Sequence, residues 1–156
     1  MFLSVCCRHM RKGVLSSSVG PAFLIRHNWS NRIKPYLQSV WPKDRDRITP
    51  AIAESFARLT LETGGAFPEA VATVLPWLML LDHQADYVVH RLSQSGLCAR
   101  FPRDALVLLN ATVNDQTPWT PTDLGKCLND IAVADPQLTE DPRLRRLLAW
   151  VQLNQP

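Results

Sequence analysis

Apolar residues recur along this chain at helical spacing, in short segments that Pro and Gly interrupt at similar intervals. The most apolar segment, residues 67–81, reads FPEAVATVLPWLMLL. A shorter copy of its start, FPRDALVLLNATV, begins thirty-four positions later at Phe101. Apolar positions recur every three or four residues in both, which predicts helices with one buried face. Pro76 lacks an amide hydrogen, so we expect the first of these helices to bend or end near Leu75.

Other helix boundaries are marked by residues that favour helix termini. Thr49-Pro50 and Asp141-Pro142 each place a capping side chain before a proline that suits the first helical position. Thr120-Pro121-Thr122-Asp123 repeats this pattern, and its acid at the third helical position predicts a capping box. Gly64-Gly65 and Gly96 predict left-handed stops at helix C-termini.

Two further helices complete the predicted set. The first starts near Trp29, and Pro35 must either kink it or lie in its first turn. Another runs from about His83 to Ser95, with Val88 and Leu92 facing inward. No alternation of apolar and polar residues indicates a strand.

Corresponding helix starts, taken in pairs, lie between thirty and forty residues apart, which is the range of helical-hairpin repeats. We therefore expect an all-α fold of about six to seven short helices in antiparallel hairpins. These hairpins are predicted to stack as a small α-solenoid of the HEAT or TPR kind, over residues 28–156. Residues 1–27 differ in pattern and are expected to be a poorly ordered basic extension, with an organellar transit peptide as the alternative.

Composition supports a folded body, with 46% hydrophobic and 20% charged residues in 156 positions. The formal charge of +3 is unevenly distributed, because residues 1–43 hold seven Lys and Arg and no acid, whereas the remainder carries a net charge of −4. A basic arm on an acidic body is one pattern of nucleic-acid-binding proteins. These cations are scattered and are not interleaved with aromatic residues, so we predict no nucleic-acid partner.

The four cysteines, Cys6, Cys7, Cys98 and Cys127, lack the CxxC spacing of a zinc or redox site. We interpret them as reduced thiols of a cytoplasmic protein. Cys98 lies between a helix stop and the next helix start, where the pKa of a thiol can be lowered. No histidine partner is evident, so a buried thiol is the preferred interpretation. No segment has the roughly twenty apolar residues of a membrane span.

His83, Asp86 and His90, in the run DHQADYVVH, are the one group that indicates chemistry. Their spacings would align three side chains on one helix face, as a metal site of two histidines and one carboxylate requires. Alternatively His83 precedes the helix, Asp82 caps it and His90 is an ordinary surface residue. Such sites usually take a ligand from a second element, and nothing else in the sequence obviously supplies it. We therefore expect no metal, no cofactor and no catalytic residue.

The five tryptophans lie near helix ends or beside apolar stripes, and an exposed subset would mark a partner surface, since tryptophan is enriched in interfaces. They are Trp29, Trp41, Trp77, Trp119 and Trp150. Core packing is the preferred explanation for most of them.

Four short motifs carry a resemblance to a group of known proteins. They are VWP at residues 40–42, ITP at residues 48–50, AFPEAV at residues 66–71 and LPWL at residues 75–78. Together with Trp29 they resemble the HEAT-like helical-repeat tail regions of large bacterial multidomain proteins, among them defence-type NTPases and sirtuin-like proteins. The resemblance covers about residues 28–153 and implies a detached or truncated C-terminal module without catalytic residues.

The sequence thus favours a non-enzymatic helical-repeat module that scaffolds or recognises another protein. A small metal-dependent enzyme using His83, Asp86 and His90 is the first alternative. A nucleic-acid-binding accessory protein using the basic N-terminal arm is the second.

Overall fold

The computed structural model describes residues 28–40, 49–78, 86–113 and 119–154, and every regular element within these ranges is helical. The α-helices are α3 (Lys34–Val40), α4 (Pro50–Leu61), α5 (Phe67–Leu78), α6 (Asp86–Ser95), α7 (Leu97–Arg100), α8 (Pro102–Thr112), α9 (Leu124–Ala134) and α10 (Pro142–Leu153). A π-helical turn, η1 (Trp29–Ile33), directly precedes α3. Two 3-10 turns lie between α-helices: η3 (Gly64–Ala66) between α4 and α5, and η4 (Pro136–Glu140) between α9 and α10. The all-α prediction is confirmed for the described residues.

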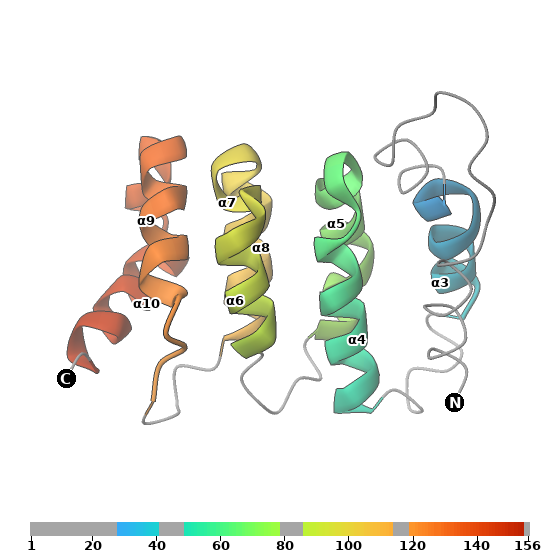
Figure 1. The fold of residues 1–156 in the computed structure, drawn as a ribbon, viewed down its shortest axis with the longest axis horizontal. Helices are drawn as coiled ribbons and strands as arrows, with labels where there is room; N and C mark the ends of the chain where they lie inside the picture. The colour runs from blue at the N-terminus through green and yellow to red at the C-terminus, as the bar shows by residue number, and fades with distance from the viewer. Residues whose placement is uncertain (1–27, 41–48, 79–85, 114–118, 155–156) are drawn as a thin grey trace.

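The helices stand side by side in chain order, from α3 at one end to α9 and α10 at the other (Figure 1). Within this order α4 packs on α5, the α6–α7 segment packs on α8, and α9 packs on α10. Contacts also connect neighbouring pairs, because α4 contacts α6 and α6 contacts α9, while α5 contacts α8 and α8 contacts α10. The helices therefore form two rows, α4–α6–α9 and α5–α8–α10.

A continuous apolar core fills the space between the two rows, and its largest fully buried side chains come from all three helix pairs. Within the first pair, the Phe56 and Trp77 rings meet edge to face with centroids 4.5 Å apart. Between pairs, Phe67 at the start of α5 lies 6.0 Å, centroid to centroid, from Phe101 just before α8. The two phenylalanines that begin the similar segments at residues 67 and 101 are thus packed against each other.

Most predicted helix ends are confirmed. The Thr49 hydroxyl accepts a hydrogen bond from the Ile52 amide at 3.4 Å, and the Asp141 carboxylate accepts one from the Arg143 amide at 2.9 Å. Gly64 and Gly96 have φ angles of +55° and +70°, a conformation that glycine adopts without the steric cost of a side chain. Helical backbone runs without interruption from Asn28 through η1 into α3, so Pro35 does not lie in the first turn of this element. It follows the π-helical turn η1, where the backbone hydrogen-bond pattern changes.

Three expectations about the helices are corrected by the structure. Of the two alternatives at Pro76, an end at Leu75 is excluded, because helix α5 continues through Pro76 to Leu78, where Trp77 and Leu78 are buried. The alternative of a bend there stays a prediction. Pro76 removes one backbone hydrogen bond, and burial of these two apolar side chains offsets that loss. A short helix that the sequence did not predict, α7, follows Gly96 and raises the count within the described residues to eight.

The third correction concerns the start of α9. The predicted capping box at Thr120 is wrong, because the helix begins at Leu124 and Asp123 is its N-cap without a side-chain capping bond. The basic extension at residues 1–27, Trp41 and the predicted start near His83 lie outside the described residues.

Candidate functional site

A cavity of about 230 Å³ lies between the N-terminal half of α6 and the segment that leads into α9. Residues from both sides line it, namely Asp86, His90, Trp119, Thr120, Pro121, Thr122 and Asp123. Two of the three residues of the predicted metal site, Asp86 and His90, are therefore brought to one cavity. The later start of α9 creates this cavity, since residues 119–123 remain outside the helix.

His90 is held from both sides of its ring. Its Nδ1 lies 2.7 Å from Asp123 Oδ2, and its Nε2 lies 3.0 Å from Gln94 Nε2. An amide nitrogen donates, so His90 Nε2 accepts and His90 Nδ1–H donates to the carboxylate. This pairing connects α6 with the segment before α9.

Two more contacts fasten α9 to α6 next to the cavity. The Lys126 ammonium donates to the Ser93 carbonyl, and the Cys127 thiol donates to the Val89 carbonyl at 3.6 Å. Both bonds run from α9 to backbone atoms of α6, so the two sides of the cavity have a defined separation. Rigid elements on both sides favour a preformed site.

Asp86 is the second carboxylate of the cavity. Among the described residues it makes no hydrogen bond or ion pair, and partial burial of its carboxyl raises its pKa above the ordinary value. The residue itself is exposed and lines the cavity, so a cation entering the cavity would be attracted to its carboxylate. Trp119, at the same cavity, keeps 49% of its surface exposed.

The predicted metal site is only partly described by the structure. His83 lies outside the described ranges, and both ring nitrogens of His90 are already engaged by Asp123 and Gln94. In the part of the chain that the structure describes, no three His, Cys, Asp or Glu side chains are placed to hold a metal ion. The three-residue site stays a prediction. Sequence reasoning missed Asp123 as a partner of His90, because the two lie 33 positions apart and no local pattern links them.

The cysteine prediction is confirmed for the two described cysteines, Cys98 and Cys127, which are free and buried. A hydrogen bond with the Cys127 thiol, together with burial, raises the pKa of the Cys98 thiol. A thiol whose pKa is raised is a poor nucleophile at neutral pH, so Cys98 is a packing residue.

The tryptophans divide as the sequence analysis anticipated. Trp29, Trp77 and Trp150 are buried and belong to the core, and Trp41 lies outside the described residues. Trp119 is exposed and marks the cavity between α6 and α9.

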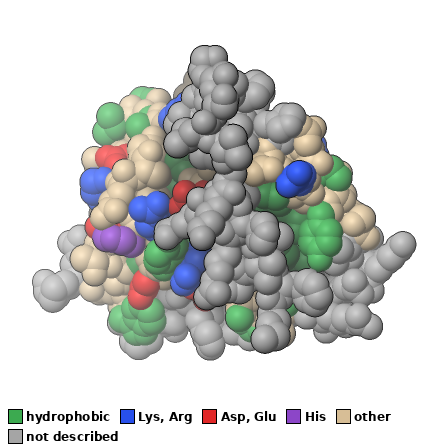
Figure 2. Space-filling model, turned by 45° about the vertical axis from the view of Figure 1, so that its right-hand side comes forward, with side chains coloured by type: hydrophobic (Ala, Val, Ile, Leu, Met, Phe, Trp, Pro, Cys, Tyr) green, Lys and Arg blue, Asp and Glu red, His purple; other side chains and the backbone are tan. Residues whose placement is uncertain are grey.

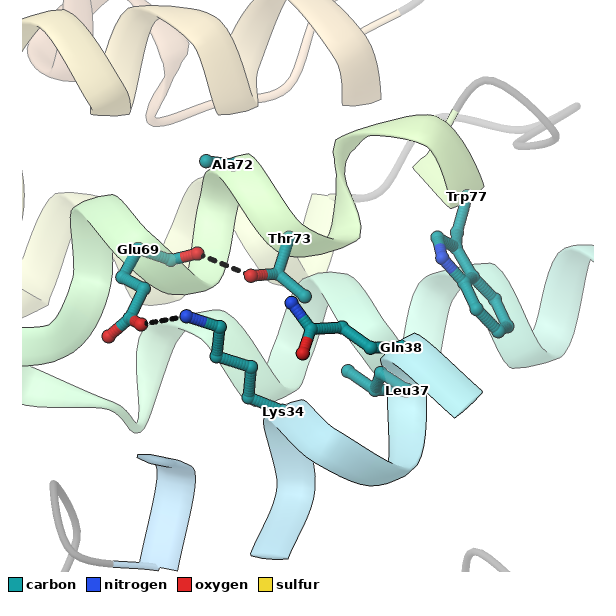
Figure 3. Close-up of a pocket in the computed structure, with 7 residues that line it drawn as sticks. All are labelled: Lys34, Leu37, Gln38, Glu69, Ala72, Thr73 and Trp77. Carbon is teal, nitrogen blue, oxygen red and sulfur yellow. Dashed lines mark hydrogen bonds and ion pairs between the residues drawn. The ribbon is translucent and has the colours of Figure 1, made fainter. Parts of the chain in front are cut away.

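A second cavity, of about 330 Å³, lies between α3 and α5. Figure 3 shows the Lys34 ammonium paired with the Glu69 carboxylate at one end and the Leu37 and Trp77 side chains at the other. The Thr73 hydroxyl is used locally, since it donates to the Glu69 carbonyl at 2.8 Å. The charges of this cavity are thus neutralised internally, in contrast to those of the α6–α9 cavity.

The visible surface has no single-sign charge field. Figure 2 shows basic, acidic and apolar side chains interspersed on one face of the described molecule. Some charges of the described residues form ion pairs between elements, such as Arg91 with Glu62 and Arg103 with Asp135 at 3.0 Å each. Within the described ranges, no helix has both the length and the apolar character needed to cross a membrane.

Comparison with known proteins finds one distant likeness. The chain is 29% identical over 122 residues to the uncharacterized protein y4cA of Sinorhizobium fredii, a match that covers 76% of this chain and 10% of that protein. The chain thus spans about a tenth of the length of the curated relative it matches. No protein-family model and no solved structure matches the chain. The relative is bacterial and large, and its name assigns no activity.

Proposed function

We propose that this chain is a non-enzymatic helical-repeat module, of the small α-solenoid type, that recognises another protein. The observation that carries the proposal is the order of helix contacts. Each row joins one helix of a pair to the corresponding helix of the next pair, α4 to α6 to α9 and α5 to α8 to α10. This nearest-neighbour arrangement is typical of repeat proteins, whose stacked hairpins present an extended binding surface.

The packing of equivalent residues supports the repeat. Phe67 and Phe101 occupy the same place in successive pairs and touch at 6.0 Å between ring centroids. In a stack, the start of each second helix lies beside the start of the next one, so equivalent side chains meet.

The distant relative is consistent with a module inside a larger bacterial protein. Only about a tenth of that protein is covered by the match, so the remaining length holds other segments. A repeat module in such a chain commonly supplies recognition while other domains supply chemistry.

Site-specific crosslinking tests the recognition role. A photoreactive phenylalanine analogue is introduced at position 119, beside the α6–α9 cavity, and separately at the control position 153 on α10, which is 84% exposed. We expect one protein to be crosslinked in the native host at position 119 and not at position 153. Equal patterns at both positions, or no crosslinked protein at position 119, would contradict the proposal.

A small metal-dependent enzyme is the second candidate, because Asp86 and His90 share a cavity. Metal analysis of the wild-type protein and of a His90→Ala variant decides between the two functions. Stoichiometric metal that is lost in the variant would favour the enzyme. Absence of metal from both proteins removes that candidate.

A further inference from the structure

We infer that the α6–α9 cavity binds the guanidinium group of an arginine side chain on an extended segment of the partner protein. This site refines the proposed recognition function and rests on it. Three features of the cavity indicate a guanidinium group: its acidic charge, its exposed aromatic ring and its size.

The charge of the cavity is complementary to one cation. Asp86 and Asp123 are both acidic, and the remaining lining residues include no Lys or Arg. One carboxylate oxygen of Asp123, Oδ2, accepts the hydrogen bond from His90 Nδ1. Asp86 makes no hydrogen bond or ion pair to any residue that the structure describes. A guanidinium group placed between them would pair with Asp86 and with the second oxygen of Asp123.

Trp119 supplies an aromatic surface at the same place. Cations are attracted to the face of an indole ring, and arginine stacks on it with its planar guanidinium. The protein already uses this interaction beside the cavity, where the Arg58 guanidinium lies 4.1 Å from the centroid of the Tyr87 ring. Tyr87 directly follows Asp86 in the sequence of α6, so the protein already holds an arginine on an aromatic ring one residue away from the cavity lining.

The size and rigidity of the cavity select a single side chain. About 230 Å³ is less than a typical small-molecule pocket and suits the end of one long side chain. The His90–Asp123 bond and the Lys126–Ser93 bond hold both sides of the cavity before any ligand arrives. A preformed site loses little entropy on binding, which favours a short peptide contact. Arginine suits it better than lysine because one planar group can both stack and form two parallel hydrogen bonds.

NMR titration of the full chain with short peptides tests the site. The probe is acetyl-Gly-Gly-Arg-Gly-Gly-amide, and the matched peptides replace Arg with citrulline, which keeps the shape and lacks the charge, or with Lys. We expect a saturable shift of the Trp119 indole N–H with the Arg peptide. Binding of the citrulline peptide should be weaker by about tenfold or more. Equal binding of the citrulline peptide, or of the Lys peptide, would overturn the guanidinium site.

Two variants locate the binding within the cavity. Asp86→Asn is isosteric and breaks no described contact, and we expect it to lower the affinity for the Arg peptide about tenfold. Trp119→Ala should also lower this affinity, and because the variant lacks the indole N–H, binding is followed by the NMR signal of the Gln94 side-chain amide. Asp104→Asn is the matched control, since Asp104 is the acid in the first turn of α8. Tyr36→Ala, at an exposed aromatic residue of α3, is the second control. Both controls should bind as the wild type does, and a loss in the controls equal to that in Asp86→Asn would overturn the site.

The peptide titration tests the arginine site, and the crosslinking experiment tests the recognition function, so a negative result in one can be told from a negative result in the other. A partner crosslinked at position 119 without any binding of the Arg peptide would overturn the arginine site and leave the recognition function standing. Binding of the Arg peptide without a crosslinked partner would leave a cation site and overturn the proposed function.

Discussion

The start of α10 offers a direct test of how this structure is stabilised, through the side chain of Asp141. Its carboxylate accepts hydrogen bonds from the Arg143 Nε at 3.0 Å, the Arg143 Nη2 at 2.7 Å and the Arg143 backbone amide at 2.9 Å. Led by the Arg143 side-chain bond, these contacts lower the pKa of Asp141 to about 2 from an ordinary 3.8. The carboxylate is therefore favoured in the folded state.

The size of the effect follows from that difference in pKa. A depression of this size corresponds to about 2 kcal/mol of folding free energy once the group is ionised in both states. The Asp141 side chain is only 17% exposed, but Arg143 is 40% exposed, and solvent screening reduces the measured contribution to about 1 kcal/mol. Because the pKa is lowered on folding, this stability is present above pH 4 and is lost as the pH falls towards about 2.

Urea denaturation of wild type and Asp141→Asn between pH 2 and pH 7 measures this contribution. Asparagine keeps the helix cap and removes the charge, so we expect the variant to be less stable by about 1 kcal/mol at pH 7 and the difference to shrink towards pH 2. Glu140→Gln is the matched control, because the neighbouring Glu140–Arg145 pair is exposed and should contribute little. A difference between wild type and Asp141→Asn that does not change across this pH range would refute the reasoning.

Three further predictions concern the core and the helix ends. Gly96→Ala should lower the free energy of unfolding by about 1 kcal/mol, because φ at this position is +70°, which strains a residue with a side chain. Gly125→Ala should raise the free energy of unfolding by about 0.5 kcal/mol, because alanine favours the helix and its Cβ would meet Val151 at an ordinary contact distance of 3.8 Å. Leu106→Ala, at a fully buried site, should cost about 2–5 kcal/mol in urea denaturation. The Cys98 thiol should react with an aromatic disulfide reagent only at the rate of unfolding, measured by stopped-flow absorbance.

The local parts of the fold could be predicted because their causes lie within a few residues. The threonine cap at Thr49, the aspartate cap at Asp141 and the left-handed stop at Gly96 each depend on one side chain or one backbone conformation. The helical periodicity of the apolar residues likewise reports which face is buried, as the burial of Val88 and Leu92 confirms.

Features that depend on distant packing were less accessible from the sequence. Pro76 predicts a bend or an end of the helix by a local rule, and the sequence does not decide between them. The helix continues to Leu78, and Trp77 packs on Phe56 from α4. Helix α7 is only four residues long, from Leu97 to Arg100, and its buried Leu97 and Cys98 are fixed by contact with α9. Neither contact leaves a trace in the spacing of nearby residues.

The candidate site shows the same limit most clearly, because it exists where a local rule was wrong. The TPTD segment has the residues of a capping box, in which Asp123 would bond to the amide of Thr120. In the fold, the Asp123 carboxylate instead meets His90 at 2.7 Å, and the Leu124 amide donates to the Pro121 carbonyl at 3.0 Å in a turn. A bond to a residue on another helix thus replaces the cap, delays the start of α9 and leaves Trp119 at the rim of a cavity. The cavity proposed above as a recognition site therefore lies where a tertiary contact overrode the local preference.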